Sequence, residues 1–229
     1  MTKKLYLIDG SGFIFRAFHA LPPLKRSDGT PVGAVYGFCS ILMRFLEQAQ
    51  ADHEQDYLAV IFDAGRKTFR QDIYPKYKAQ RPEVPEDLIP QFPLIRSACN
   101  AFQIPSIELE GFEADDLIAS YAAAAIPQGF EVIVVSSDKD LMQLVKPGVT
   151  MLDPIKNKVV AEEQVLEKFG VVPEKVIDVQ ALAGDASDNV PGVPGIGIKT
   201  AAELINTFGD LELLLQNADT IKQPKRRQL

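Results

Sequence analysis

Acidic residues stand where apolar, strand-like segments of this chain end. Three such segments, residues 5–8, 58–62 and 132–135, are followed by Asp9, by Asp63, and by Asp138 with Asp140. In an open parallel sheet the carboxyl ends of the strands share one edge, so these acids are expected to share one crevice. Two carboxylates ~4 Å apart repel by about 4 kcal/mol at an effective dielectric near 20, so a dense cluster requires cations. The pattern predicts a metal site.

A second acidic group stands at the head of a predicted helix and comprises Glu113, Asp115 and Asp116. On an ideal helix Glu113 and Asp116 lie within about 60° of each other, whereas Asp115 points about 100° away from Asp116. We therefore expect Asp115 to serve a different cation or its water shell. The alternative for this group is stabilisation of the helix dipole, and the alternative for Asp9, which precedes Gly10, is a simple turn.

Composition limits the class of protein. With 229 residues, 46% hydrophobic and 24% charged, the chain is typical of a globular protein with one sizeable domain and a smaller one. No apolar run approaches the roughly 20 residues of a membrane helix, and the first residues do not resemble a signal peptide, so we expect a cytoplasmic protein without membrane contact.

Cysteine and histidine are too few for a zinc site. Cys39 and Cys99 have no partner at metal-binding spacing and are expected to be buried, reduced thiols. The only histidines are His19 and His53. An all-oxygen site for Mg²⁺, with Mn²⁺ as a substitute, is therefore favoured.

The order of elements indicates an α/β core followed by a helical module. Strands are predicted near 4–9, 58–63 and 131–136, with a weaker one near 104–109. Helices are predicted near 34–50, 88–102 and 112–125, and after them near 162–169, 174–183 and 198–208. This alternation predicts a parallel sheet covered on both faces. We place the α/β core at residues 1–161 and the helical module at 162–229.

The helical module contains a glycine-rich segment, Gly-Val-Pro-Gly-Ile-Gly at 192–197, which follows Asp185 and Asp188. A nucleotide-binding P-loop is excluded because Lys199 comes one residue late and no strand precedes the loop. A hairpin between two helices is favoured, in which Gly192, Gly195 and Gly197 let N–H groups approach a DNA phosphate and Lys199 adds a cation. The alternative is a tight turn. Asp185 and Asp188 either cap a helix or complete the metal cluster.

Net charge does not argue against nucleic acid as a partner. The chain carries −7, but removing the nine candidate metal ligands from its 31 acids leaves 22 against 24 basic residues. Basic and aromatic residues alternate over 66–82, a composition that suits single-stranded nucleic acid. The alternative is a solvated surface helix. Prolines at 75, 82, 85, 90 and 93 argue against one rigid helix.

The motifs of this chain, taken in their order along the sequence, resemble those of the 5′-nuclease, or flap endonuclease, family. The similarity is greatest to the N-terminal 5′ to 3′ exonuclease domains of bacterial type I DNA polymerases, and it runs from the first residues to about 220. It rests on Ile8-Asp9-Gly10, Phe62-Asp63, Thr68-Phe69-Arg70, Tyr77-Lys78-Ala79-Gln80-Arg81-Pro82, Glu113-Ala114-Asp115-Asp116, Ser137-Asp138-Lys139-Asp140 and Gly184-Asp185-Ala186-Ser187-Asp188-Asn189.

The resemblance implies a PIN-like α/β nuclease core, a helical arch at about 66–95 and a C-terminal helix-three-turn-helix module. It implies that all nine acids serve the metal site, that Lys78 and Arg81 contact the scissile phosphate, and that Arg70 and Tyr77 contact DNA, Tyr77 by stacking on a base. It further implies K⁺ at the glycine hairpin, 5′ ends and 5′-flap or branched duplexes as substrates, and a polymerase domain that follows a monomeric nuclease. The chain ends at Leu229 in what resembles mid-helix, so we expect a fragment.

Phosphodiester hydrolysis by two Mg²⁺ ions fits this arrangement. Our hypothesis assigns Asp9, Asp63 and Asp116 to one ion and Asp140, Asp185 and Asp188 to the other. Two alternatives remain. The chain binds branched DNA without cleaving it, or it is a phosphatase or primase-like enzyme that uses the pair Asp138 and Asp140. The first strand disfavours the enzyme alternative, because an aspartyl phosphatase needs Asp-x-Asp there and a primase-type site needs a glutamate.

Overall fold

The computed structural model describes residues 3–50, 56–154, 156–221 and 223, and for 48–50 only the backbone. His53 and the C-terminal residues 224–229 lie outside the described residues. The chain divides into two compact units. The first comprises Met1–Phe69, Pro82–Asp138 and Gly148–Lys158, and the second comprises Arg70–Arg81, Lys139–Pro147 and Val159–Leu229. The boundary near residue 161 stays a prediction. No helix in the described ranges is long and apolar enough to cross a membrane.

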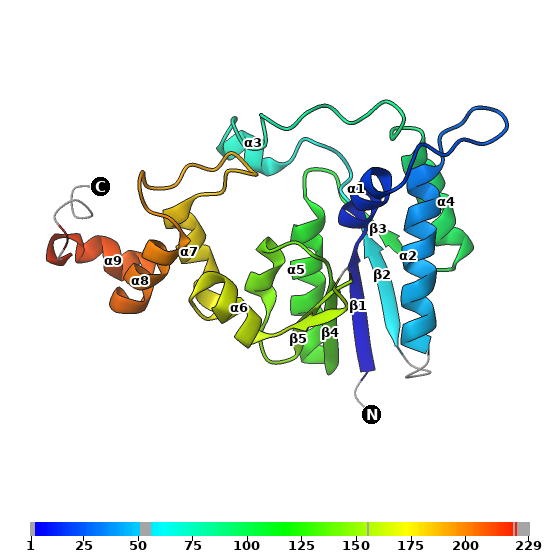
Figure 1. Cartoon of the computed structure of the whole chain (residues 1–229). Helices are drawn as coiled ribbons and strands as arrows, with labels where there is room; N and C mark the ends of the chain where they lie inside the picture. The colour runs from blue at the N-terminus through cyan, green and yellow to red at the C-terminus, as the bar shows by residue number, and fades with distance from the viewer. Residues whose placement is uncertain (1–2, 51–55, 155, 222, 224–229) are drawn as a thin grey trace. The chain divides into compact units, whose positions relative to one another are not determined.

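Strands β1 to β5 of a six-stranded sheet form the centre of the first unit (Figure 1). Its order is β3-β2-β1-β4-β5-β6, with bounds β1 Lys3–Asp9, β2 Tyr57–Ile61, β3 Ser106–Ile107, β4 Phe130–Val135, β5 Val149–Asp153 and β6 Lys158–Val160. The pairs β1–β2, β1–β4, β2–β3 and β4–β5 are parallel, so the carboxyl ends of these strands share one edge. The predicted parallel α/β sheet is confirmed; β5 and β6 are not among the predicted strands.

Helices cover both faces of this sheet. They are α1 Gly10–Ala20, α2 Gly33–Gln50, α4 Gln91–Ala101 and α5 Ala114–Ala125. Ile8 belongs to a buried cluster with Phe38 of α2 and Ile95 of α4. Leu7 is also fully buried and points to the opposite face, because side chains alternate along a strand. There α5 contacts β1, β2 and β4.

Helix α1 is absent from the sequence prediction, which considers only a turn after Asp9. Two glycines in the first turn, Gly10 and Gly12, lower the intrinsic helix propensity. Tertiary packing overrides this preference. A Cβ atom at position 10 would overlap the ring of Phe62, and the carboxylate of Asp9 caps the helix by accepting a hydrogen bond from the Gly12 N–H at 2.8 Å.

The second unit is largely helical. It contains α6 Glu162–Phe169, α7 Val176–Ala183, α8 Ile198–Phe208 and α9 Leu211–Gln216, with α8 contacting the other three. Phe169, Val179 and Ile205 are buried in it. The helices predicted at 162–169, 174–183 and 198–208 are confirmed, apart from a 3₁₀ turn at Pro173–Lys175 that precedes α7.

The predicted arch at 66–95 is helical only in part. Within the described residues of this segment, α3 Phe69–Ile73 and the first turns of α4 are α-helical, and turns and irregular backbone make up the rest. The prolines explain this, since each lacks the N–H that a continuous helix requires.

Candidate metal and DNA site

Asp9 is one of the two buried acids of the predicted site, with Glu113. It ends β1, and its carboxylate accepts hydrogen bonds from the Gly12 N–H and from the Ser136 hydroxyl, both at 2.8 Å. Burial raises the pKa of Asp9, and the negative charges of Asp63 and Asp138 raise it further. The three carboxylates therefore interact electrostatically, as acids at one sheet edge should.

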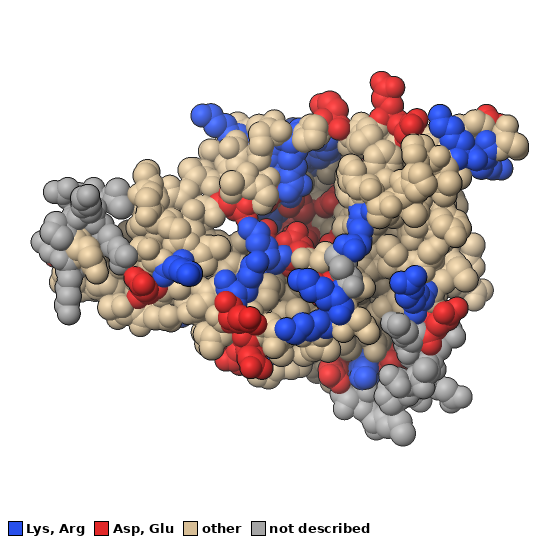
Figure 2. Space-filling view, viewed as in Figure 1, with Lys and Arg blue, Asp and Glu red and all other residues tan. Residues whose placement is uncertain are grey.

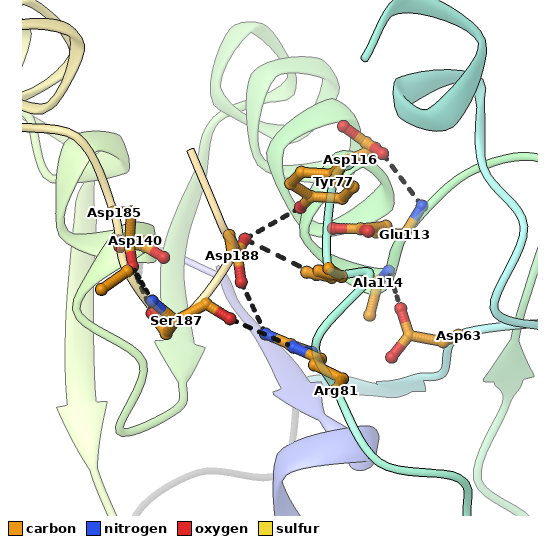
Figure 3. A network of polar contacts seen from close by, with 12 residues as sticks. Asp63, Tyr77, Arg81, Glu113, Ala114, Asp116, Asp140, Asp185, Ser187 and Asp188 are labelled. Atoms are coloured by element: carbon orange, nitrogen blue, oxygen red, sulfur yellow. Dashed lines mark hydrogen bonds and ion pairs between the residues drawn. The ribbon is translucent and has the colours of Figure 1, made fainter. Parts of the chain in front are cut away.

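Asp63 is held at the head of α5. Its N–H donates to the Ser11 hydroxyl at 3.0 Å, and its carboxylate accepts from the N–H of Ala114, the first residue of α5, at 2.8 Å (Figure 3). The strand-end acid and the acids of α5 thus meet at one place in the first unit, although fifty residues of sequence separate them.

Glu113, Asp115 and Asp116 occupy the start of α5. Glu113 is its buried N-cap residue, and the Asp116 carboxylate accepts a hydrogen bond from the Glu113 N–H at 2.9 Å (Figure 3). The alternative interpretation, stabilisation of a helix start, therefore applies to Asp116. Glu113, Asp115 and Asp116 also lie beside Asp63, as ligands of a shared metal site must. An acid can both stabilise the helix start and bind a metal ion.

Ser136 connects two strand ends. It follows β4, donates its hydroxyl hydrogen to Asp9, and accepts a hydrogen bond from the Asp138 N–H at 3.0 Å. It is buried. All six acids predicted in the first unit, namely Asp9, Asp63, Glu113, Asp115, Asp116 and Asp138, therefore lie at the end of β1, just after β2 and β4, or in the first turn of α5.

In the second unit a lysine stands between two predicted metal ligands. The ammonium of Lys139 lies 2.6 Å from the carboxylate of Asp185 and 3.9 Å from that of Asp140. Asp140 also accepts from the Gln180 amide at 2.5 Å, and Asp185 accepts from the Ser187 N–H at 2.7 Å. Partial burial raises the pKa of Asp185, but the hydrogen bonds from Lys139 and Ser187 outweigh it and lower the pKa to about 2.

Asp188 contacts the two basic side chains that are predicted to be catalytic, Lys78 and Arg81. Its carboxylate lies 2.6 Å from the Arg81 guanidinium and 3.7 Å from the Lys78 ammonium, and it accepts a hydrogen bond from the Tyr77 hydroxyl at 2.9 Å (Figure 3). The Lys78 N–H donates to the Asp188 carbonyl at 2.9 Å. Lys78 adopts a left-handed backbone conformation, φ 53°, which a non-glycine residue rarely adopts. Segment 74–81 is therefore docked on the loop that follows α7.

Tyr77 does not present an open stacking face. Its ring is 9% exposed, with the Lys78 ammonium 5.0 Å and the Arg70 guanidinium 5.9 Å from its centre. Cations beside a ring face are attractive, so this arrangement stabilises the docked segment. Stacking of Tyr77 on a base stays a prediction and requires this segment to rearrange.

The hairpin glycines divide into two kinds. A Cβ atom at Gly192 would overlap the backbone of Ala183 and Gly184, so this glycine serves close packing. Gly195, at φ +82°, and Gly197, the N-cap of α8, have open space where a Cβ would stand. Lys199 is exposed in the first turn of α8. Gly195, Gly197 and Lys199 thus lie in open surroundings, and contact of all three glycines and Lys199 with a phosphate stays a prediction.

The donor set is that of a hard cation. Within the described residues, no three His, Cys, Asp or Glu side chains are close enough together to hold a metal ion. Nevertheless, the charges of Asp63 and Asp138 already raise the pKa of Asp9, and protein cations already bind Asp185 and Asp188. Carboxylate oxygens that already attract positive charge are the kind of ligand that Mg²⁺ and Mn²⁺ prefer. Figure 2 shows basic and acidic side chains interspersed on the face it draws, so this face is not uniformly acidic despite the net charge of −7.

Comparison with known proteins identifies the family. Residues 4–170 match the model of the 5′-3′ exonuclease N-terminal resolvase-like domain, and residues 171–229 match that of the 5′-3′ exonuclease C-terminal SAM fold. The chain belongs to the 5′-3′ exonuclease family. The predicted family and its PIN-like fold with a C-terminal helical module are thereby confirmed.

Two relatives illustrate the extent of this exonuclease similarity. DNA polymerase I of Rhizobium leguminosarum is 59% identical over 228 residues, covering 98% of this chain and 22% of that protein. The 5′-3′ exonuclease of Aquifex aeolicus is 45% identical over 215 residues, covering 94% of this chain and 73% of that protein. The chain thus spans about a quarter of the length of the polymerase relatives and most of the exonuclease relative.

Solved structures of the family share the fold. T5 5′-exonuclease with bound divalent zinc ions is 26% identical, with a TM-score of 0.75 over 98% of this chain and 83% of that one. The bacteriophage T5 D15 flap endonuclease, in a pseudo-enzyme-product complex with DNA and metal ions, is 25% identical, with a TM-score of 0.75 over 98% of this chain and 82% of that one.

Four residues near the predicted acids are not identified from the sequence as parts of the site. Lys139 and Ser136 stand within or next to the motif that contains Asp138, and a lysine between two acids is a signal that could have been used. Arg96 of α4 stacks 4.1 Å from the centre of the Phe62 ring and donates to the Asp63 carbonyl at 3.4 Å. Asp153 ends β5, so it is a further strand-end acid. Neither Arg96 nor Asp153 lies in a recognisable motif.

Proposed function

We propose that this chain is a metal-dependent 5′-nuclease that hydrolyses DNA phosphodiester bonds, as a 5′ to 3′ exonuclease and as a flap endonuclease in DNA replication and repair. The observation that supports this most is the hydrogen bond from the Ala114 N–H to Asp63. It joins a strand-end acid to the acids of α5 in a family whose members are named for this activity.

Roles for the residues follow from their chemistry. Asp9, Asp63 and Asp116 of the first unit would hold one Mg²⁺, and Asp140, Asp185 and Asp188 of the second unit would hold the other; Mn²⁺ would substitute. Bound metal would supply an activated water and would stabilise charge on the phosphate and on the departing 3′-oxygen. Glu113, Asp115 and Asp138 would complete the ligand shells, through water where they do not bind directly.

Lys78 and Arg81 would bind the scissile phosphate. Both now contact Asp188, so a DNA phosphate and Asp188 compete for the same two cations. An arginine donates two parallel hydrogen bonds to a phosphate, an arrangement that stabilises negative charge as it develops. Arg70, Gly195, Gly197 and Lys199 would contact the DNA backbone away from the cleaved bond, and K⁺ at the hairpin would reinforce that contact.

The natural setting is inferred from the relatives. Because the chain matches about a quarter of several DNA polymerase I sequences, we infer that a polymerase domain follows it in the native protein. We also infer a monomer that acts in the cytoplasm on 5′ ends and on 5′-flap or branched duplexes.

A cleavage assay with three substrates tests the proposal. A 5′-flap duplex, single-stranded DNA and a phosphomonoester are each incubated with Mg²⁺ or with EDTA. We expect Mg²⁺-dependent cleavage of DNA only, loss of cleavage in Asp63→Ala with flap binding retained within severalfold, and no loss in Glu131→Gln, at the opposite end of the sheet. Cleavage by Asp63→Ala in Mg²⁺ would contradict the metal site. Flap binding by the wild-type protein without cleavage would favour the alternative of a branched-DNA-binding protein.

A further inference from the structure

Two aromatic rings lie exposed beside the acids of the first unit. The rings of Phe69 and Phe112 have centres 5.7 Å apart and planes tilted by 53°. Phe69 is 40% exposed and Phe112 42% exposed, and Leu109, 50% exposed, precedes the turn that contains Phe112. Scattered exposed apolar residues are ordinary on a protein surface, but a contacting aromatic pair is a more specific feature.

The backbone fixes the position of both rings. The Phe69 N–H donates to the Gly111 carbonyl at 3.0 Å, and Thr68 forms an isolated parallel bridge with Gly111. Thr68 is only 3% exposed. The segment that follows β2 is thereby tied to the segment that precedes α5, so the two rings are held next to each other before any ligand binds.

The pair adjoins the predicted metal ligands. Phe112 directly precedes Glu113, and the next residue, Ala114, donates its N–H to Asp63 (Figure 3). On the other side, the exposed cations Arg66 and Lys67 precede Phe69 by two or three residues. Arg66 forms a surface ion pair with Glu83 at 2.9 Å, and surface ion pairs contribute little to stability.

We propose that Phe69 and Phe112 form a stacking platform for an unpaired nucleobase of the DNA, with Arg66 and Lys67 binding the adjacent phosphates. The proposal rests on the proposed nuclease function and adds the part of the substrate that the exposed rings recognise. Aromatic faces beside cations suit single-stranded DNA, because every base has a face that stacks and every phosphate needs a cation. Tyr77, with a buried ring, does not offer such a face in this structure.

The lack of tryptophan in this chain makes the proposal directly measurable, since Phe112→Trp introduces a single fluorescent reporter. A single-stranded 5′ overhang is titrated into this variant in EDTA, so that no cleavage occurs. We expect base stacking to quench the tryptophan fluorescence, and we expect the variant to bind the overhang as tightly as the wild-type protein. Blunt duplex of the same length should quench it much less.

A second aromatic pair provides a matched control. Tyr57 and Phe130 begin β2 and β4, at the opposite end of the sheet, with ring centres 5.3 Å apart and Tyr57 49% exposed. Tyr57→Trp should show no quenching by the overhang. The double variant Phe69→Leu/Phe112→Leu should bind the overhang about tenfold more weakly but blunt duplex unchanged, and its thermal unfolding verifies that it folds.

Equal quenching in Phe112→Trp and Tyr57→Trp, or none in Phe112→Trp while DNA binds, would overturn the stacking platform and leave the proposed function intact. Equal weakening of overhang and duplex binding in the double variant would also overturn it. Failure of the wild-type protein to bind either DNA would instead overturn the proposed function, and the platform with it.

Discussion

The ammonium of Lys139 lies 2.6 Å from the Asp185 carboxylate and 3.9 Å from that of Asp140. Two acids that we assign to one metal ion thus already share a single cation that belongs to the chain. A divalent ion that binds these acids must compete with the lysine, and the lysine in turn prevents the two carboxylates from facing each other without a counter-ion.

We therefore expect Lys139→Met to bind Mn²⁺ severalfold more tightly than the wild-type protein at the acids Asp140 and Asp185, because a competing cation is removed. Isothermal titration calorimetry without DNA measures this. Lys175→Met is the control, since Lys175 contacts Asp178 and Asp210 at 3.9 and 4.0 Å, neither of which is a predicted ligand. Weaker or unchanged Mn²⁺ binding in Lys139→Met would show that the lysine does not compete with the metal.

Asp188→Asn should release segment 74–81. The substitution removes the charge that holds Arg81 and Lys78, at 2.6 and 3.7 Å. We expect trypsin to cleave after Lys76 or Lys78 several times faster than in the wild-type protein, with the sites assigned by mass spectrometry. Asp178→Asn, which loses only a surface ion pair, should digest at the wild-type rate. Digestion of Asp188→Asn at that same rate would mean that other contacts hold the segment.

Gly192→Ala should destabilise the second unit, whereas Gly197→Ala should not. A methyl group at position 192 would overlap the backbone of Ala183, which cannot move aside as a side chain could, and we expect a loss of at least about 2 kcal/mol in the free energy of unfolding. Position 197 has open space and an ordinary φ of −97°. Urea denaturation followed by circular dichroism gives both values. Similar stability of the two variants would contradict the close approach at Gly192.

The Cys99 thiol should remain protonated and unreactive in the native protein. Burial raises its pKa to about 11, and the nearby Cys39 adds to the increase. Because the folded pKa exceeds the unfolded value of about 8.5, the neutral thiol favours the folded state below that pH, and the contribution disappears as the pH rises through about 11. Iodoacetamide at pH 8 should modify Cys99 only after denaturation, as read by mass spectrometry. Rapid modification in native conditions would show that the site opens.

Local sequence signals were sufficient for much of the fold. The apolar runs that end at Asp9 and near Asp63 predict β1 and β2, and the periodic segments 162–169 and 198–208 predict α6 and α8 to within a residue. These elements are long or strongly periodic, so their patterns are clear without tertiary information. β6 has only three residues, and Thr150 interrupts the apolar run of β5, so neither strand shows such a pattern; α1 begins with glycines that only its packing on Phe62 explains.

The candidate site, like the fold, could be predicted from the sequence only in part. The local sequence was enough to place these acids at strand ends and at the head of α5, because the direction of parallel strands makes their carboxyl ends neighbours. The side-chain contacts follow from the folded structure: Ser136 joins Asp9 to Asp138, Lys139 binds Asp185, and Asp188 binds Arg81. These pairs are far apart in the chain or hidden inside one motif. Their distances depend on how loops close and on which rotamer each side chain adopts, and no local pattern encodes either.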